Sequence, residues 1–473
     1  MAQDKYFDIA LQGLKALVQE RGEDSTFPFD AVWSYTKEEV PGKNKPHQAG
    51  RLTDAGYLEL TGNSTRAETQ ARAGSPTREY RPGPAMRSHP VTCAPSPSAA
   101  TVSDAFKGME KAMAGQGFVI TAGELANFYL ALLVSPLVIM TGISGTGKSR
   151  LPRLFAELIG ASFACIPVKP QWDDNSDLFG YTSNLNQGVF VKGQVTSVLQ
   201  AAAAELIKPS FVLLDEMNLA AVEHYFSDFL SIIETRRRTA GSIITDTLPI
   251  DLPREIDGQD DPHSELRALY LPPNVRVVGT ANMDETTRNF SPKVLDRAFS
   301  IEFNEVDLTA FPAATTRPVS VEQFHNLATR LVDPQNPVTV HEGYREQGQL
   351  FDDVAGLIEE VRTILEPAGL SFGYRPRDAS CLYMWHWKKD NLESLLPYNT
   401  ALDYCILQKV LPKIYGQGER LRAALENLEG WLQGQSVIGL EADPTRQLLR
   451  SAEKVKRMRQ RLEEEGATAY WSA

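Results

Sequence analysis

A glycine-rich stretch at residues 141–150, TGISGTGKSR, has the residue types that bind phosphate groups in proteins. It fits the pattern G-x-x-x-x-G-K-[ST], which ends here in Lys148 and Ser149. Glycines let backbone N–H groups turn toward an anion at the start of a helix, whose positive end adds to the attraction. In such a loop the lysine reaches the terminal phosphates of a nucleoside triphosphate, and the serine hydroxyl ligates Mg²⁺. The predicted nucleotide contacts are Gly142, Ser144, Gly145, Thr146, Gly147, Lys148, Ser149 and Arg150.

Two adjacent acids, Asp215 and Glu216, end the apolar run FVLLDE further along the chain. At the end of a buried strand, Asp215 could hold Mg²⁺ through water, and Glu216 could orient or deprotonate an attacking water. The alternative is a solvated surface pair without a catalytic role. Together with the phosphate loop, the two acids favour hydrolysis of the nucleotide, since a small-molecule kinase needs no residue that activates water.

Two later polar residues could complete a hydrolysis site. Asn282 ends the run VVGTAN and could orient the attacking water, although asparagine is also a common turn former at such a position. Arg297 follows in SPKVLDRAF. It could form an ion pair with Asp296 or a neighbour. Alternatively, it could reach the γ-phosphate bound by an adjacent subunit and stabilise the charge of the transition state.

These residues need a sheet that brings strand ends together. Four apolar runs, PLVIM, SFACIPV, SFVLLDE and NVRVVGTAN, alternate with helical segments, which predicts a parallel sheet with helices on both faces. A capping box, TAGE, predicts that a helix starts after Thr121, with Glu124 reaching back. From residue 321 onward the pattern is helical. The last stretch, 445–465, has an apolar stripe that fits packing on its own lid better than binding to a partner.

The first 81 residues are interpreted as a small α+β unit. Three segments with helical periodicity precede a strand pair, GYLELTG and TREYRPG, which is the order of elements in a winged helix. A stretch rich in Pro, Ser and Ala follows as a linker. The expected domains are a target-recognition unit at 1–81, the linker at 82–103, an α/β nucleotide-binding core at 104–315, a helical lid at 316–432 and a C-terminal helix at 433–473.

The charge of the N-terminal unit differs from that of the whole chain. Between Lys43 and Arg87 there are eight Lys or Arg against four Asp or Glu, whereas the chain has a formal net charge of −12. The basic segment predicts DNA binding through Arg66, Arg72 and Arg78, in and beside the wing. The alternative is a small interaction module whose basic face is merely solvated.

The composition argues against several classes of protein. Four cysteines lie far apart without C-x-x-C spacing, which argues against a zinc site or a disulfide framework and fits a reducing cytoplasm. The net charge argues against a nonspecific nucleic-acid coat. The chain starts without a signal-peptide pattern, and its most apolar run, 128–140, is too short to span a bilayer. We expect a cytoplasmic protein with no membrane contact.

Four segments resemble the AAA+ superfamily, and most closely its McrB-like branch. The resemblance covers residues 106–432. It implies a ring of subunits, usually hexameric, that hydrolyses ATP or GTP with Mg²⁺ at the subunit interfaces, and a separate McrC-like nuclease subunit that the ring drives. The segments are IPVKPQWDDNSDLFGY, FVLLDEMNLAAVEHYFSDFLSIIE, GTANMDETTRNFSPKVLDRAF and LQKVLPKIYG.

The resemblance also implies roles for single residues, and one stretch departs from the pattern. The best-known member of the branch uses GTP and carries N-T-x-D, whereas NMDETTR places Asp284 two residues after Asn282, which slightly favours ATP. The implied roles are phosphate binding for Lys148 and Ser149, the acid pair for Asp215 and Glu216, the first sensor for Asn282, the arginine finger for Arg297, and the lid sensor for Arg375 with Arg377 as its alternative.

Two further segments are interpreted through the family and through helix electrostatics. GSIITDTLPIDL falls where the family carries a hairpin. The three arginines at 236–238 are interpreted as cations that favour a helix C-terminus, and the alternative is a contact to a partner or to DNA. The whole sequence predicts the motor subunit of a DNA restriction or antiviral system, with no nuclease signature of its own. The alternative is a MoxR-like chaperone that remodels protein partners.

Overall fold

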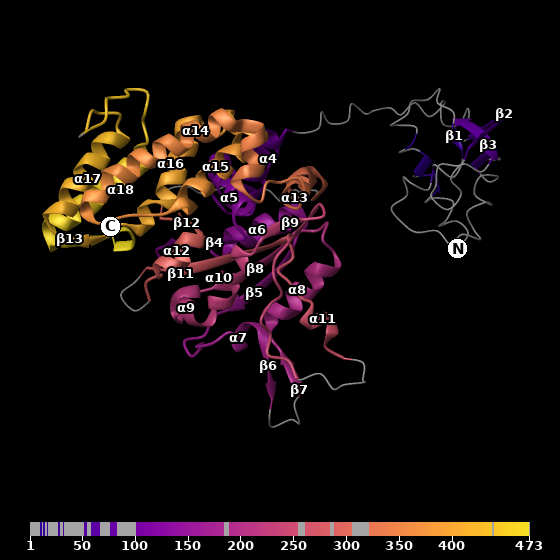
Figure 1. Ribbon diagram of the computed structural model, residues 1–473, viewed down its shortest axis with the longest axis horizontal. Coiled ribbons are helices and arrows are strands. Elements are labelled where there is room, and N and C mark those ends of the chain that lie inside the picture. The colour runs from indigo at the N-terminus through magenta and orange to yellow at the C-terminus, as the bar shows by residue number, and fades with distance from the viewer. Residues whose placement is uncertain are drawn as a thin grey trace. The chain divides into compact units, whose positions relative to one another are not determined.

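In the computed structural model the chain forms two compact units, Met1–Ala99 and Ala100–Ala473 (Figure 1). No helix in the described part of the chain has the length and apolar character needed to cross a membrane. The residues whose structure is described are 10–11, 13–14, 17, 27–28, 32, 52–53, 58–66, 76–82, 101–183, 189–253, 261–283, 288–304, 321–437 and 439–472.

The first unit contains a small antiparallel sheet. Strand β2 (Leu58–Arg66) pairs with β3 (Pro76–Pro82), and the short strand β1 (Phe27–Pro28) joins β3 at its other edge. Leu58 and Tyr80 of the paired strands are buried. The strand pair lies where the sequence predicted it. The expected second and third helices fall largely outside the described residues, so the winged-helix assignment stays a prediction.

The second unit is built on a five-stranded parallel sheet, which confirms the α/β fold predicted from the sequence. Its strand order is β12-β4-β11-β8-β5. Four of the strands are the four apolar runs. The fifth, β12, was not predicted, because its four residues FSIE are too few to stand out as a run. The strands are β4 (Leu137–Gly142), β5 (Ser162–Pro167), β8 (Ser210–Asp215), β11 (Val275–Asn282) and β12 (Phe299–Glu302).

Successive side chains of the strands enter two hydrophobic cores, one on each face of the sheet. In β4, Val138 and Met140 enter one core and Leu137 and Ile139 the other. Because helices cover both faces, the strand is buried along its whole length. The first core takes helices α4 (Val102–Gly115), α5 (Ala122–Val134) and α6 (Arg150–Ile159), and the second takes α7 (Ser176–Phe179), α8 (Gln194–Ala204), α9 (Val222–Tyr225), α10 (Ser227–Glu234), α11 (Ser264–Arg267) and α12 (Pro292–Arg297).

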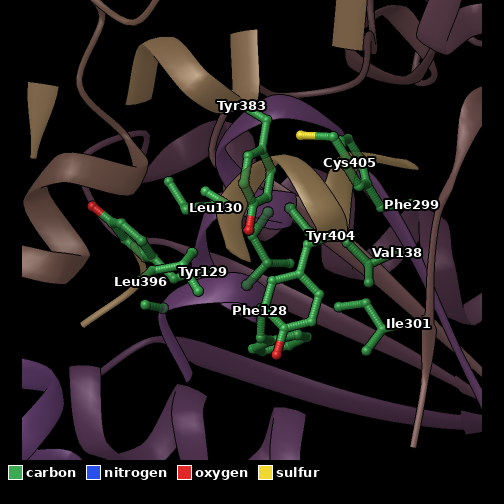
Figure 2. Close-up of a cluster of buried hydrophobic side chains, with 14 of the residues drawn as sticks. Phe128, Tyr129, Leu130, Val138, Phe299, Ile301, Tyr383, Leu396, Tyr404 and Cys405 are labelled. Atoms are coloured by element: carbon green, nitrogen blue, oxygen red, sulfur yellow. The ribbon is translucent and has the colours of Figure 1, made fainter. Parts of the chain in front are cut away.

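The start of α5 confirms the predicted capping box. The hydroxyl of Thr121 accepts a hydrogen bond from the Glu124 N–H at 3.2 Å, and the Glu124 carboxylate accepts one from the Thr121 N–H at 2.9 Å. Two N–H groups that the helix cannot pair are thereby satisfied. The helix then carries Phe128 and Tyr129 into an aromatic cluster on one face of the sheet (Figure 2).

A helical region follows the sheet, as predicted, and it packs on α5 and β12 (Figures 1 and 2). Phe299 of β12 stacks on Tyr383 with ring centroids 5.9 Å apart. The predicted C-terminal stripe, including Val455 and Met458, is buried within the same core, so the last helix packs on its own lid. The helices are α13 (His325–Leu331), α14 (Val340–Leu365), α15 (Tyr374–Lys389), α16 (Tyr398–Lys409), α17 (Glu419–Leu432) and α18 (Leu449–Glu465).

Three two-stranded antiparallel pairs accompany these elements in the described part of the second unit. Positive φ angles at Ala240 and Gly241, 50° and 83°, allow the two-residue turn of one pair. The second strand of that pair lies within the segment where the family resemblance implied a hairpin. The pairs are β6 (Gly180–Ser183) with β7 (Val189–Lys192), β9 (Arg237–Thr239) with β10 (Ser242–Ile244), and β13 (Tyr415–Gln417) with β14 (Ala467–Ala469).

The three arginines at 236–238 follow Thr235, the C-cap of α10, and only part of them binds the end of that helix. Arg237 donates a hydrogen bond to the carbonyl of Thr235, the residue that ends the helix, at 3.0 Å. Arg238 instead forms an ion pair with Glu342 at 3.1 Å and donates to the Asn336 carbonyl at 2.7 Å. It therefore ties the hairpin to the helical region.

Candidate nucleotide site

The phosphate loop joins the end of β4 to the start of α6. Gly142 has a φ of 142°, and a Cβ there would lie 2.5 Å from the carbonyl oxygen of Phe303. Gly147 has a φ of 97°, and a Cβ there would lie 2.5 Å from the ring of Phe118. Glycine is required at both positions because the backbone is left-handed and a neighbour is close. Thr146 stiffens the loop by donating to one of its carbonyls at 3.1 Å.

The ammonium group of Lys148 is folded onto the loop. Its Nζ donates to the carbonyls of Gly142 at 2.9 Å and Ile143 at 2.6 Å, and the residue is 6% exposed. Burial lowers the pKa of Lys148, while the charges of Asp215 and Glu216 oppose that shift. A phosphate anion could take over from the two carbonyls and give the buried cation a charged partner.

Ser149, Asp215 and Thr280 meet at one point. Oδ1 of Asp215 accepts hydrogen bonds from the Ser149 hydroxyl at 2.6 Å and from the Thr280 hydroxyl at 2.8 Å. A hydroxyl and a carboxylate this close fit the oxygen ligands of one Mg²⁺ ion, which usually keeps only one or two protein ligands beside the substrate phosphates. Thr280 was not predicted, because only the pairing of β11 with β8, Gly279 opposite Leu214, brings it to Asp215.

Glu216 leaves β8 in the left-handed conformation, with φ 55° and ψ 49°. This conformation costs a residue other than glycine about 1–2 kcal/mol. A hydrogen bond from the Glu216 N–H to the Thr280 hydroxyl, at 3.1 Å, holds it. The residue is exposed, so that water can reach its carboxylate next to the Asp215 site.

Asn282, the last residue of β11, is paired in register with Gly142 and therefore lies beside the start of the phosphate loop. Its carbonyl accepts a hydrogen bond from the side chain of Asn218 at 2.9 Å, and the same amide donates to the Arg288 carbonyl at 3.2 Å. Asn218 is buried and was not predicted, since its role depends on two segments that meet only in the fold. Asp284 lies outside the described residues.

The remaining predicted contacts of the loop lie at its tip and its wall. Ser144 and Gly145 are exposed. Arg150 turns toward the segment before α5, where its guanidinium donates to the Gly117 carbonyl at 3.3 Å and lies 5.7 Å from the centroid of the Phe118 ring. The structure therefore places the Arg150 side chain against Gly117 and Phe118, beside the phosphate loop.

Arg297 and Arg375 lie together and share a carboxylate. Arg297 ends α12 and forms an ion pair with Glu234 at 2.8 Å. Arg375, in the first turn of α15, also pairs with Glu234, and with Asp296 at 3.1 Å. Arg377 pairs with the next residue in the chain at 2.7 Å. Glu234 was not predicted from the sequence, because α10 meets α12 and α15 only in the fold.

This arginine pair lies near one end of the strands of the sheet, and the phosphate loop lies at the other end. The carbonyl of Arg297 accepts a hydrogen bond from the hydroxyl of Ser135 at 3.0 Å, and Ser135 precedes β4. The phosphate loop leaves the other end of this six-residue strand. At about 3.3 Å per residue the two ends are roughly 20 Å apart, which is longer than an arginine side chain. The structure thus forms two groups, one at the loop and acid pair and one at the arginines.

A cavity of about 560 Å³ adjoins the arginine pair and is rich in cations. Besides the pair, Arg236, Arg377 and Lys409 line it. The Nζ of Lys409 donates to the Ala298 carbonyl at 2.6 Å, and burial, with Arg375 nearby, lowers its pKa to about 7. Lys409 lies in LQKVLPKIYG, one of the segments that carry the family resemblance, which is the sequence signal that could have identified it.

The proposed DNA contacts fall in the first unit. Arg66 is the last residue of β2, and Arg78 lies in β3 opposite Ser64. Arg72 lies outside the described residues. DNA binding through these three arginines therefore stays a prediction.

Comparison with known proteins finds an AAA domain in the second unit. Residues 137–298 match the family model described as AAA domain (dynein-related subfamily), and residues 332–467 match a domain of unknown function, DUF8727. No curated protein matches the chain. A crystal structure from Cytophaga hutchinsonii, provisionally described as an ATPase, is 16% identical, with coverage of 67% of this chain and 90% of that chain and a TM-score of 0.39.

The AAA match begins at the first residue of β4 and ends one residue beyond Arg297. It therefore contains the phosphate loop, the acid pair and the arginine at the opposite end of the strands. Together with the parallel sheet and its covering helices, the match gives the second unit an AAA+ α/β fold that carries a nucleoside-triphosphate site.

Proposed function

From this AAA+ fold, we propose that the chain is a nucleoside triphosphatase that works in a ring, in which the arginine pair of one subunit acts on the nucleotide bound by its neighbour. The observation that carries the proposal is the distance between Arg297 and the chain's own phosphate loop, the length of β4. An arginine there can stabilise charge on a phosphate only if the phosphate belongs to another subunit.

Within one subunit, the loop residues divide the work of binding and hydrolysis. Lys148 leaves the two loop carbonyls and pairs with the terminal phosphates. Ser149 and Asp215 would hold Mg²⁺, which neutralises phosphate charge when it is bound. Glu216 accepts a proton from the attacking water, or orients it, from an exposed position beside Asp215. Asn282 lies at the adjacent strand end and could fix the same water.

The second group completes the site from the neighbouring subunit. In the isolated chain, Arg297 pairs with Glu234, and Arg375 pairs with Glu234 and Asp296. Arginine forms charge-assisted, often bidentate contacts with phosphate as it does with carboxylate. A γ-phosphate brought up by the neighbour could therefore replace part of these contacts without leaving a cation unpaired, and the charge that develops during hydrolysis would be stabilised.

The work done by the ring is proposed from the sequence resemblance. We assign the chain to a DNA restriction or antiviral system of the McrB-like kind, with DNA bound by the N-terminal unit and cleavage by a separate McrC-like nuclease subunit. The basic wing supports this assignment. The dynein-related AAA match is equally compatible with remodelling of proteins, so a MoxR-like chaperone remains the alternative.

Hydrolysis of ATP and GTP by the full chain, measured side by side with Mg²⁺, tests the proposal. We expect turnover of at least one nucleotide and none in Lys148→Ala, because the phosphate charge loses its partner. Duplex DNA that raises turnover would support the restriction assignment, and stimulation by protein substrates alone would favour the chaperone. Wild-type protein that hydrolyses neither nucleotide would contradict the proposed function.

A further inference from the structure

The first peptide group of the phosphate loop is held from both sides. The Gly142 carbonyl accepts a hydrogen bond from Lys148 Nζ at 2.9 Å, and the N–H of the same peptide, on Ile143, donates to Oδ1 of Asn304 at 2.9 Å. Lys148 must release its side of the peptide to reach a phosphate. The bond to Asn304 then still holds this peptide from its other side.

Asn304 is itself fixed by a residue from the far end of the chain. Its Nδ2 donates to Oε1 of Glu302 at 2.7 Å, and the same oxygen accepts a hydrogen bond from Nζ of Lys454 at 2.9 Å. The Lys454 side chain, on α18, is 4% exposed, and that of Glu302 is 18% exposed. Removing one partner from a pair this buried leaves a charge without compensation, so the pair is kept together far more strongly than a surface ion pair.

The residues after α18 hold Lys454 in turn. Its Nζ lies 4.5 Å from the centroid of the Tyr470 ring, and Tyr470 is fully buried. Trp471 packs against Tyr470 at 4.6 Å and against Phe290 at 6.3 Å between ring centroids. Phe290 follows the strand that ends in Asn282. The C-terminal segment therefore contacts Lys454, the partner of Glu302, and also packs against Phe290.

We propose that Asn304 and Lys454 are positioning residues for the nucleotide site. Lys454 fixes Glu302, Glu302 fixes Asn304, and Asn304 fixes the first peptide of the phosphate loop. Because coupling between two sites is reciprocal, nucleotide binding also stabilises the docking of α18 and the residues after it. This inference rests on the proposed binding of nucleotide at Lys148, and it makes the C-terminal helix part of the nucleotide response.

Equilibrium titration of the full chain with a fluorescent ATP analogue, and with its GTP counterpart, tests the coupling. Asn304→Ala and Lys454→Met should each raise Kd by about 3- to 10-fold, the range expected when one hydrogen bond that positions the site is lost. The double variant should be no weaker than the worse single variant, because both changes break the same path. Lys456→Met, at an exposed position of the same helix, should leave Kd unchanged.

A further variant, at Glu302, keeps the test valid if Lys454→Met does not fold. Glu302→Met removes the oxygen that accepts both hydrogen bonds and should show the same rise in Kd, with no further loss when it is combined with Asn304→Ala. Wild-type protein that binds neither analogue would overturn both the inference and the proposed function. Tight wild-type binding with unchanged Kd in the folded variants, or with effects that simply add, would overturn the inference alone.

Discussion

Asp215 and Thr280 illustrate, at the scale of residues, what the sequence could and could not predict. Asp215 was predicted because it ends an apolar run and carries a charge, both of which are visible in the sequence. Thr280, Asn218 and Asn304 look like ordinary strand and turn residues, and they contact the site only because separate strands are paired. Residues that act through their chemical type are therefore predictable, whereas residues that act through register are not.

Glu216 gives the prediction that belongs to this scale. Glu216→Gln should bind nucleotide as tightly as wild type and lose at least about 100-fold in turnover, since an amide cannot accept the proton of the attacking water. Binding by fluorescence and hydrolysis by phosphate release would be measured on the same preparation. Glu223→Gln, an exposed acid on α9, is the matched control. Wild-type turnover in Glu216→Gln would remove this residue from the mechanism.

At the scale of elements, hydrophobic periodicity in the sequence located four of the five strands of the parallel sheet and the C-terminal helices. It could do so because those segments contain apolar residues over many positions. It missed β12, and it could not show that α10, α12 and α15 converge. Because these helices converge, Glu234 lies between two arginines, and Arg375 lies far from the phosphate loop of its own chain. Contacts between elements far apart in sequence leave no periodic signal.

Arg276 of β11 shows how elements are joined, and it gives a prediction at this scale. The residue is 2% exposed, and its guanidinium donates to the carbonyls of Leu132, near the end of α5, at 2.6 Å and Leu331, at the end of α13, at 2.7 Å. Burial lowers the pKa of Arg276 to about 9. The cation holds the C-terminal ends of two helices against the sheet.

Arg276→Met should lower the free energy of unfolding by about 2–3 kcal/mol, because both helix ends are left with unsatisfied carbonyls. Part of that loss is offset by removing a buried charge. The midpoint of thermal unfolding of the second unit would be measured for Arg276→Met and for Arg420→Met. Arg420 is an exposed arginine on α17 and serves as the control. Equal midpoints for the two variants would show that Arg276 does not join these elements.

At the scale of the whole molecule, the main feature is the separation between the two groups of candidate site residues. The phosphate loop and acid pair lie at one end of the strands, and Arg297 and Arg375 lie at the other, a strand length away. Under the proposed function, a single chain would carry two halves of two different sites. Assembly head to tail around a closed ring would bring every loop to a neighbour's arginine pair.

The most direct test is to mix Lys148→Ala and Arg297→Ala subunits, each of which should be inactive alone. In an equal mixture with random order, about a quarter of the interfaces would pair an intact phosphate loop with an intact arginine of the adjacent subunit. We predict hydrolysis well above the sum of the separate variants, once labelled subunits have been shown to exchange. No gain in well-mixed assemblies, or wild-type turnover by Arg297→Ala alone, would contradict the account.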